Sequence, residues 1–127
     1  ALWGDLGSGK TVFARAFINA RAGNPEEVPS PTYTLVQTYE VPENGGTVLV
    51  YHFDLFRIEE PEEILELCLD EARSGGIALI EWPDRLGPLL PADRLDISLN
   101  PGKKPDARQA AINGFGGWVN RFEDLVE

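Results

Sequence analysis

The residues best suited to chemistry form one short stretch near the start of the chain. Gly4-Asp5-Leu6-Gly7-Ser8-Gly9-Lys10-Thr11 fits the phosphate-binding pattern G-x-x-x-x-G-K-S/T at every fixed position. Glycines let the backbone fold around an anion with its N–H groups turned inward, and a following helix adds the positive end of its dipole. Lys10 would neutralise the outer phosphates of a nucleotide, and the Thr11 hydroxyl would hold magnesium. The plainer alternative is a glycine-rich turn without a ligand.

Two carboxylates stand where apolar stretches end. The apolar run from Ile77 to Ile80 is typical of a fully buried strand and leads directly to Glu81. We expect Glu81 to hold magnesium, because a P-loop site needs a carboxylate at the end of a neighbouring strand. Asp54 follows another apolar stretch, and we expect it to bind magnesium through water or to orient the water that attacks the γ-phosphate. For both, the alternative is a strand-end carboxylate held by backbone N–H groups.

Three further residues have a functional and a structural interpretation. Thr32 lies between Pro31 and Tyr33, where it is either a switch hydroxyl that senses the γ-phosphate or an ordinary loop residue. His52 is the only histidine, and we expect it to be structural rather than catalytic. Trp82 is expected to be part of the core or of a pocket wall. The acidic run from Glu59 to Glu71 is either a solvated helix face or a surface that recruits a basic partner.

The elements that must position these residues follow from periodicity and from turn residues. We expect a helix over Lys10–Ala22, with Val12, Phe13, Ala16, Phe17 and Ala20 on its apolar face. A turn at Pro42–Gly46 predicts a hairpin between strands at Tyr33–Glu40 and Thr47–Phe53. Further on we expect a helix from Pro61 to Arg73, strands at Ile77–Ile80, Leu95–Leu99 and Arg108–Ile112, and a short helix over Trp118–Glu127. Strands that alternate with helices predict an α/β protein whose ligand site lies outside the carboxyl ends of the strands.

Composition limits the classes of protein to consider. The 127 residues, 43% hydrophobic and 25% charged, suit one folded domain over residues 1–127. A net charge of −10 argues against broad direct contact with nucleic-acid phosphates. No apolar run approaches the length of a membrane span, so we expect no membrane association. The single cysteine, Cys68, excludes an internal disulfide and suits a cytoplasmic location.

Only Ala1, Leu2 and Trp3 precede the glycine-rich stretch, although a P-loop normally follows a complete buried strand. We therefore expect an upstream strand and the residues that support the base of a nucleotide to be missing from this sequence.

Four motifs together are similar to one known family. They are Gly4 to Thr11, Ser30-Pro31-Thr32-Tyr33-Thr34-Leu35-Val36, Tyr51-His52-Phe53-Asp54-Leu55-Phe56-Arg57 and Ile80-Glu81-Trp82-Pro83. In order and spacing they resemble the bacterial TsaE (YjeE) family, the ATPases of tRNA threonylcarbamoyladenosine biosynthesis. The resemblance extends from Gly4 to about Leu99, and it implies that an N-terminal helix and part of the first strand are absent from this sequence. Ser8 stands where alanine is common in the family, and Phe56 stands where tyrosine is common.

The resemblance implies a P-loop NTPase-like, three-layer α/β fold with a mixed, mostly parallel central sheet. It also implies binding of ATP or ADP with Mg²⁺ and action with the TsaB and TsaD proteins, with tRNA reached only through that complex. The nucleotide-binding residues would be Asp5, Leu6, Gly7, Ser8, Gly9, Lys10, Thr11, Val12 and Trp82. Thr11 and Glu81 would hold magnesium, while Asp54, Lys10 and Thr32 would serve catalysis. The family's C-terminal nucleotide contact does not align, so Lys104 and Arg108 are both candidates for it.

Two other classes of protein remain open from the residues alone. A small-molecule kinase would use the same P-loop, but it needs a lid with arginines, and the region after Trp82 offers only Arg85 and Arg94 before the next strand. A nucleotide-binding adaptor would use ATP to set its shape, without turnover of its own.

Overall fold

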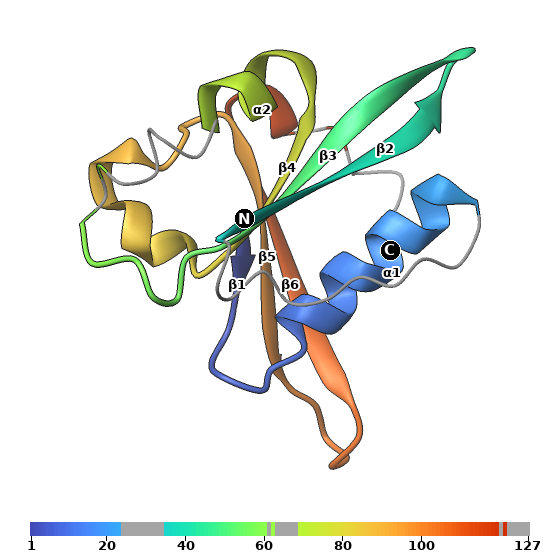
Figure 1. The fold of residues 1–127 in the computed structure, drawn as a ribbon. Helices are drawn as coiled ribbons and strands as arrows, with labels where there is room; N and C mark the ends of the chain where they lie inside the picture. The colour runs from blue at the N-terminus through green and yellow to red at the C-terminus, as the bar shows by residue number, and fades with distance from the viewer. Residues whose placement is uncertain (24–34, 61, 63–68, 120, 122–127) are drawn as a thin grey trace.

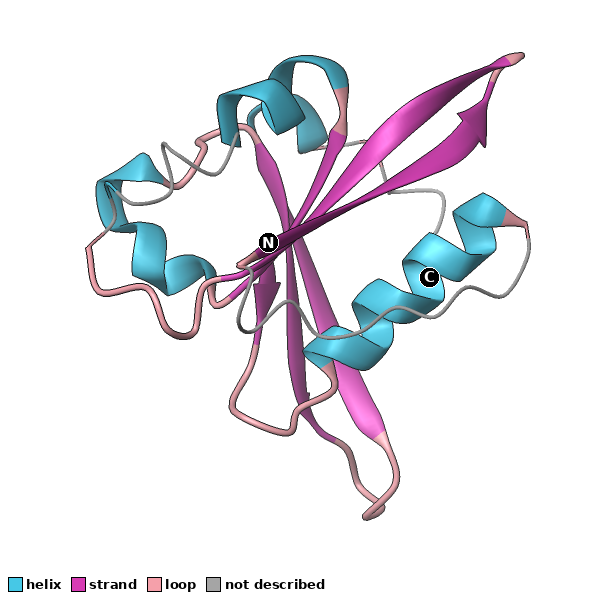
Figure 2. Cartoon of the chain, in the orientation of Figure 1, coloured by secondary structure: helices cyan, strands magenta, loops and turns pink. Residues whose placement is uncertain are grey.

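The computed structural model describes residues 1–23, 35–60, 62, 69–119 and 121. In chain order the elements are β1 (Leu2–Trp3), α1 (Lys10–Ala22), β2 (Val36–Glu43), β3 (Gly46–Asp54), α2 (Leu69–Gly75), β4 (Ile77–Glu81), η2 (Pro83–Leu89), β5 (Arg94–Pro101), β6 (Arg108–Phe115) and η3 (Gly116–Trp118), where η marks a 3-10 helix. Strands and helices alternate along most of the chain, as Figure 2 shows.

The strands form one six-stranded sheet in the order β2-β3-β4-β1-β5-β6. The four inner strands run parallel, because β3 pairs with β4 and β1 pairs with both β4 and β5 in that sense. The outer strands β2 and β6 are antiparallel to their neighbours. The prediction of a mixed, mostly parallel sheet is therefore confirmed.

Helical segments cover both faces of this sheet. Figure 1 shows the sheet nearly edge-on, with α1 on one side and η2 on the other. The core cluster on the α1 side contains Leu2, Ala14, Ile18, Val41, Val50 and Leu79. The cluster on the opposite side, formed with α2 and η2, contains Tyr51, Phe53, Leu55, Ile58, Leu69, Ala72, Ile80 and Leu86. Successive residues of β3 thus face opposite layers, which is why this strand is buried from Val50 to Asp54.

The strand order reverses at β1, and the candidate functional residues lie at this reversal. From β1 the chain passes through α1 to β2, β3 and β4 on one side of β1, and then crosses to β5 and β6 on its other side. Ligands of open α/β sheets bind outside the carboxyl ends of the strands at such a reversal. Gly4 to Thr11 leave β1 at this point, and Asp54 and Glu81 end the two adjacent strands, β3 and β4.

The β2–β3 hairpin is confirmed, but its turn is shorter than predicted. Pro42 and Glu43 belong to β2, and only Asn44 and Gly45 form the loop, with φ angles of 45° and 83°. Positive φ at both loop positions is characteristic of the two-residue hairpin turn, whose backbone twist matches that of the strands it joins. A proline is tolerated in β2 because this strand lies at the edge of the sheet, where an N–H can be dispensed with.

The buried face of α1 differs from the predicted one. The helix covers Lys10–Ala22 as expected, but Val12, Ala16 and Ala20 are exposed. Ala14 and Ile18 are fully buried instead, with Phe13 and Phe17 partly buried beside them. Apolar residues occur on more than one side of this helix, so packing against the sheet, and not periodicity, selects the buried side.

The other predicted elements differ from the observed ones mainly in where they begin and end. The strand predicted at Ile77–Ile80 is confirmed and includes one more residue, Glu81, whereas β5 and β6 exceed their predicted bounds more, at Arg94–Pro101 and Arg108–Phe115. The region after Trp82, for which no helix was predicted, contains η2. Most of the predicted helices over Pro61–Arg73 and Trp118–Glu127 lies outside the described residues, as does Thr32. No helix in the described part of the chain combines the length and apolar character needed to cross a bilayer.

Candidate functional site

The path of the glycine-rich loop between β1 and α1 depends on its residue types. Gly4 has a φ of 148°, and a Cβ there would collide with Ser8 Oγ and lie 2.9 Å from the backbone oxygen of Leu99. Gly9 precedes α1 in a left-handed conformation, and no side chain caps the helix there. The first amides of α1 therefore have no capping partner and can bind an anion.

The Lys10 side chain lies within the loop that it follows. Its Nζ donates hydrogen bonds to the backbone oxygens of Gly4, at 2.6 Å, and Asp5, at 2.9 Å. The residue is only 4% exposed. Burial lowers the pKa of Lys10, although the nearby carboxylates of Glu81, Asp54 and Asp5 act in the opposite direction. A phosphate at this position would restore an anionic partner to the ammonium and so favour its charged form.

Thr11 and Glu81, predicted to hold magnesium together, are in direct contact. Thr11 Oγ1 donates a hydrogen bond of 2.8 Å to Glu81 Oε1, across 70 residues of sequence. This bond uses the hydroxyl hydrogen and leaves the lone pairs of Oγ1 available to a cation. A hydroxyl, a carboxylate and nucleotide phosphates are a donor set that suits Mg²⁺, which needs only one or two protein ligands beside phosphates and water. The described residues contain no cluster of three or more His, Cys, Asp or Glu side chains that could hold a metal ion.

Asp54 lies beside Glu81 because the ends of their strands coincide. The two residues are register partners in the parallel β3–β4 pair. Asp54 is 6% exposed, and its Oδ1 accepts a hydrogen bond of 3.1 Å from the backbone N–H of Phe56. The structural interpretation, a carboxylate held by a backbone N–H, is therefore correct for one oxygen. It does not exclude a role in the adjacent cleft, since Asp54 also lines that cleft.

These side chains surround one cleft of about 400 Å³. It is lined by Leu6, Gly7, Gly9, Lys10, Thr11, Val12, Asp54, Phe56, Arg57, Glu81 and Trp82. Trp82 follows β4 with a left-handed backbone, φ 59°, a conformation that bulky residues rarely adopt and that is common at functional sites. Its ring centroid lies 4.1 Å from Lys10 Nζ and 5.0 Å from the Phe56 ring. Trp82 is therefore a wall of the cleft.

Most of the predicted site residues thus meet at one place. Asp5 and Ser8 do not line the cleft but support it, because the Ser8 N–H donates to the Asp5 oxygen within the loop. Thr32 lies outside the described residues. Sequence reasoning did not single out Phe56 and Arg57 as site residues, although both belong to the motif that begins at Tyr51.

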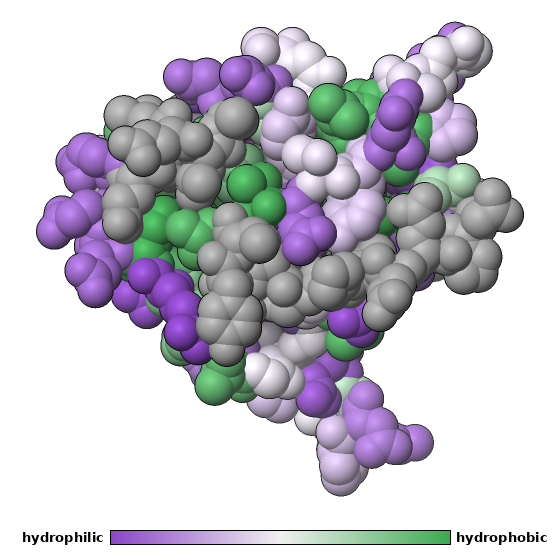
Figure 3. All heavy atoms as spheres, in the orientation of Figure 1, coloured by the Kyte–Doolittle hydropathy of each residue, from purple (hydrophilic) through white to green (hydrophobic). Residues whose placement is uncertain are grey.

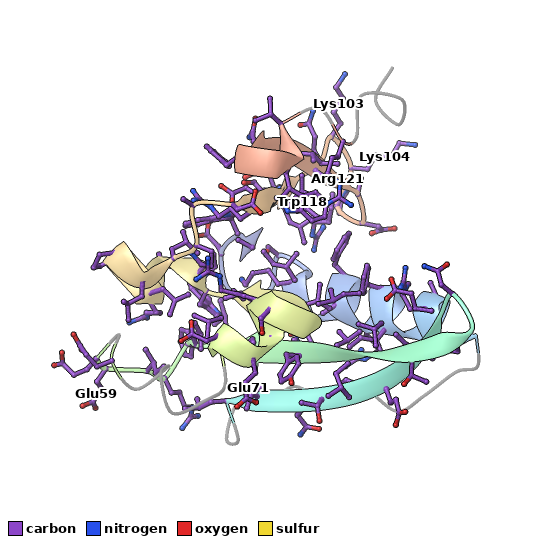
Figure 4. All side chains as sticks on the ribbon, turned by 90° about the horizontal axis from the view of Figure 1, so that it is seen from above. Glu59, Glu71, Lys103, Lys104, Trp118 and Arg121 are labelled. Carbon is purple, nitrogen blue, oxygen red and sulfur yellow. The ribbon has the colours of Figure 1, made fainter. Side chains whose placement is uncertain are left out.

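Arg108, one of the two candidates for a C-terminal nucleotide contact, reaches the glycine-rich loop. Its Nε donates a hydrogen bond of 3.2 Å to the backbone oxygen of Ser8, which joins the start of β6 to the loop. Lys103 and Lys104 instead lie exposed at the turn between β5 and β6, where Figure 4 shows both side chains pointing outward. The same tip, the lowest part of the molecule in Figure 3, is hydrophilic. Figure 4 also places Glu59 and Glu71 at the far side of the molecule from these lysines.

Replacing Arg108 with alanine is expected to weaken nucleotide binding about tenfold. The substitution removes a charge-assisted hydrogen bond that holds the Ser8 carbonyl, and such bonds contribute about 1.5–3 kcal/mol. The measurement is a binding titration with ATP, with Lys104→Ala as the control at an exposed position of the same hairpin. An unchanged affinity for Arg108→Ala would mean that the loop keeps its shape without this contact.

Comparisons with known proteins agree on one family. A family model described as threonylcarbamoyl adenosine biosynthesis protein TsaE matches residues 1–110. A curated protein of Rickettsia bellii, named tRNA threonylcarbamoyladenosine biosynthesis protein TsaE, is 45% identical over 96 residues, which are 76% of this chain and 64% of that protein. A protein of the same name from Bacillus subtilis is 37% identical over 127 residues, covering 99% of this chain and 73% of that protein.

A solved structure supports the same conclusion for the fold. The crystal structure of Bacillus subtilis YdiB superposes with a TM-score of 0.66 at 29% identity, covering 98% of this chain and 70% of that one. The chain spans less than two thirds of the length of the Rickettsia relatives, 64% for Rickettsia bellii and 53% for Rickettsia conorii.

Proposed function

Because this chain belongs to the TsaE family, we propose that it binds ATP with Mg²⁺ and hydrolyses it in support of tRNA threonylcarbamoyladenosine biosynthesis. TsaB and TsaD are the proposed partners, and tRNA is reached through them. The hydrogen bond between Thr11 and Glu81 carries the proposal, because it brings the hydroxyl of the phosphate loop onto a strand-end carboxylate beside the cleft.

Each side chain then has a defined task. The amides of the loop and the first turn of α1 hold phosphate oxygens, and Lys10 exchanges its carbonyl partners for the β- and γ-phosphates. Thr11 and Glu81 hold magnesium, which when bound neutralises charge on the transferred phosphoryl group. Asp54 orients the water that attacks the γ-phosphate, and Trp82 bounds the nucleotide on one side.

The acidic character of the chain favours a partner-dependent role. A net charge of −10 opposes direct binding to the phosphates of tRNA, which requires clustered Lys and Arg. The water-positioning step of P-loop NTPases is often completed by a group supplied in trans. We therefore expect slow hydrolysis by this chain alone.

The test is magnesium-dependent phosphate release measured with and without TsaB and TsaD. We expect release to rise when both partners are present and to be absent in EDTA. If phosphate instead appeared on an added small molecule without net release of inorganic phosphate, the protein would be a kinase and the proposal would be wrong.

Replacing Glu81 with glutamine is expected to reduce the apparent affinity for Mg²⁺ about tenfold. The amide keeps the size of the side chain but removes the charge that attracts the cation. A magnesium titration of ATP binding measures this effect, and ATP affinity in EDTA should change much less. Glu71→Gln, on the exposed surface of α2, is the matched control. A titration curve identical to that of the unmodified protein would contradict the assignment.

A further inference from the structure

His52 is the one histidine of the chain, and it lies in direct contact with the proposed magnesium ligand. The residue is fully buried on β3, two positions before Asp54, and therefore on the same face of the sheet as Asp54. Its Nε2 lies 2.5 Å from Glu81 Oε2. Because an ionised carboxylate can only accept hydrogen bonds, Nε2 carries the hydrogen and donates it to Glu81.

The two oxygens of Glu81 therefore have different partners. Oε1 accepts from the Thr11 hydroxyl, which lines the cleft, and Oε2 accepts from His52, which does not. The carboxylate is fixed at both ends, so it cannot rotate without breaking one of the two bonds. Only Oε1 is directed to the place where phosphates and a cation would meet.

The other ring nitrogen of His52 lowers the stability of the folded state. His52 Nδ1 is buried and has no hydrogen-bond partner among the described residues. A buried nitrogen without a partner destabilises the folded state by about 1–3 kcal/mol. An apolar residue of similar volume would remove this cost, but it would leave the buried Glu81 Oε2 without its donor. The contact with Glu81 is therefore the reason for histidine at this position, and not the packing of its ring.

We propose that His52 is a positioning residue that makes Glu81 a one-oxygen ligand, and that it thereby favours Mg²⁺ over Ca²⁺ in the cleft. The inference rests on the proposed function, because it assigns the residue that sets the geometry of the same cation site. Mg²⁺ takes single oxygens in a strict octahedron, whereas Ca²⁺ takes more ligands and often both oxygens of one carboxylate. A Glu81 carboxylate that is free to turn would present both oxygens and would lose this preference.

The test compares two substitutions of His52. His52→Leu removes the donor while nearly keeping the volume, and His52→Gln keeps an N–H donor where Nε2 lies. Binding of a fluorescent ADP analogue is titrated with Mg²⁺ and, separately, with Ca²⁺, and is also measured in EDTA. For His52→Leu we expect the apparent Mg²⁺ affinity to fall at least about tenfold, the size typical when the partner of a metal ligand is removed. Ca²⁺ affinity and binding in EDTA should stay nearly unchanged, and His52→Gln should restore the preference for Mg²⁺.

The possible outcomes separate the inference from the proposed function. If the unmodified protein showed no dependence on Mg²⁺, the proposed function and the inference would both fall. If it did, but His52→Leu kept the same ratio of Mg²⁺ to Ca²⁺ affinity, only the inference would be overturned. An equal loss for both cations, or a loss that His52→Gln did not restore, would also overturn it. Should His52→Leu fail to fold, His52→Asn replaces it, because its shorter amide cannot reach the position of Nε2.

Discussion

Alanine in place of Lys10 is expected to lower the affinity for ATP about 100-fold. Lys10 is the side-chain cation that lies within the phosphate loop, with its Nζ held 2.6 Å from the Gly4 oxygen. A hydrogen bond between charged groups contributes up to about 3 kcal/mol, which is about two orders of magnitude in affinity. The loss should be specific to phosphate, so adenosine, which lacks it, should bind no differently to the variant.

The matched control is Lys103→Ala. Lys103 is exposed at the β5–β6 turn, so its removal changes the net charge equally without touching the cleft. Isothermal titration with ATP and ADP compares the two variants, and thermal unfolding verifies that both are folded. Equal affinities for Lys10→Ala and Lys103→Ala would exclude a P-loop role for Gly4 to Thr11.

Alanine in place of Asp54 is expected to abolish turnover while leaving nucleotide binding intact. Loss of a group that positions or activates the attacking water costs about 10²- to 10⁴-fold in rate. Binding should persist because the phosphate contacts come from the loop, Lys10 and the first turn of α1. The measurement is phosphate release in the presence of TsaB and TsaD, together with a titration of ATP affinity.

Two controls make this result interpretable. Asp84→Ala removes an exposed carboxylate of η2, close enough to influence the pKa of Lys10, and should leave the rate nearly unchanged. Asp54→Asn can still accept the hydrogen bond from the Phe56 N–H, so it separates chemistry from the local turn. If Asp54→Ala kept the partner-dependent activity in tRNA modification, the nucleotide would only set the shape of the protein, and the adaptor alternative would be correct.

Candidate site residues can be predicted from the sequence where the relevant structure depends only on neighbouring residues. The pattern from Gly4 to Thr11 predicts a phosphate-binding loop because loop geometry and the start of the helix depend on nearby residues only. Asp54 and Glu81 were found because each ends an apolar run, and carboxyl ends of parallel strands meet at one edge of a sheet. The likeness of four motifs to the TsaE family, confirmed by the comparisons, is the basis of the proposed pathway, which no local rule contains.

Other features could not be predicted because they depend on which elements become neighbours. The hydrogen bond from Arg108 to the Ser8 oxygen joins residues that are 100 positions apart. It depends on β6 pairing with β5, which brings the start of β6 beside the loop. The prediction of the buried side of α1 was wrong for the same reason. Val12 lines the cleft, and packing against the sheet buries Ala14 and Ile18 instead.

By itself, then, the sequence determined the chemistry available at Gly4 to Thr11, the two strand-end carboxylates and the class of the fold. Residue type and short-range spacing are sufficient for these, since backbone conformation and burial of a strand are largely local. Only the tertiary structure decided which side chains the Glu81 carboxylate contacts. Register between β3 and β4 placed His52 against Glu81 and turned the remaining oxygen of Glu81 toward Thr11. Strand register is set by the packing of the whole sheet against its helices, and no stretch of sequence specifies it alone.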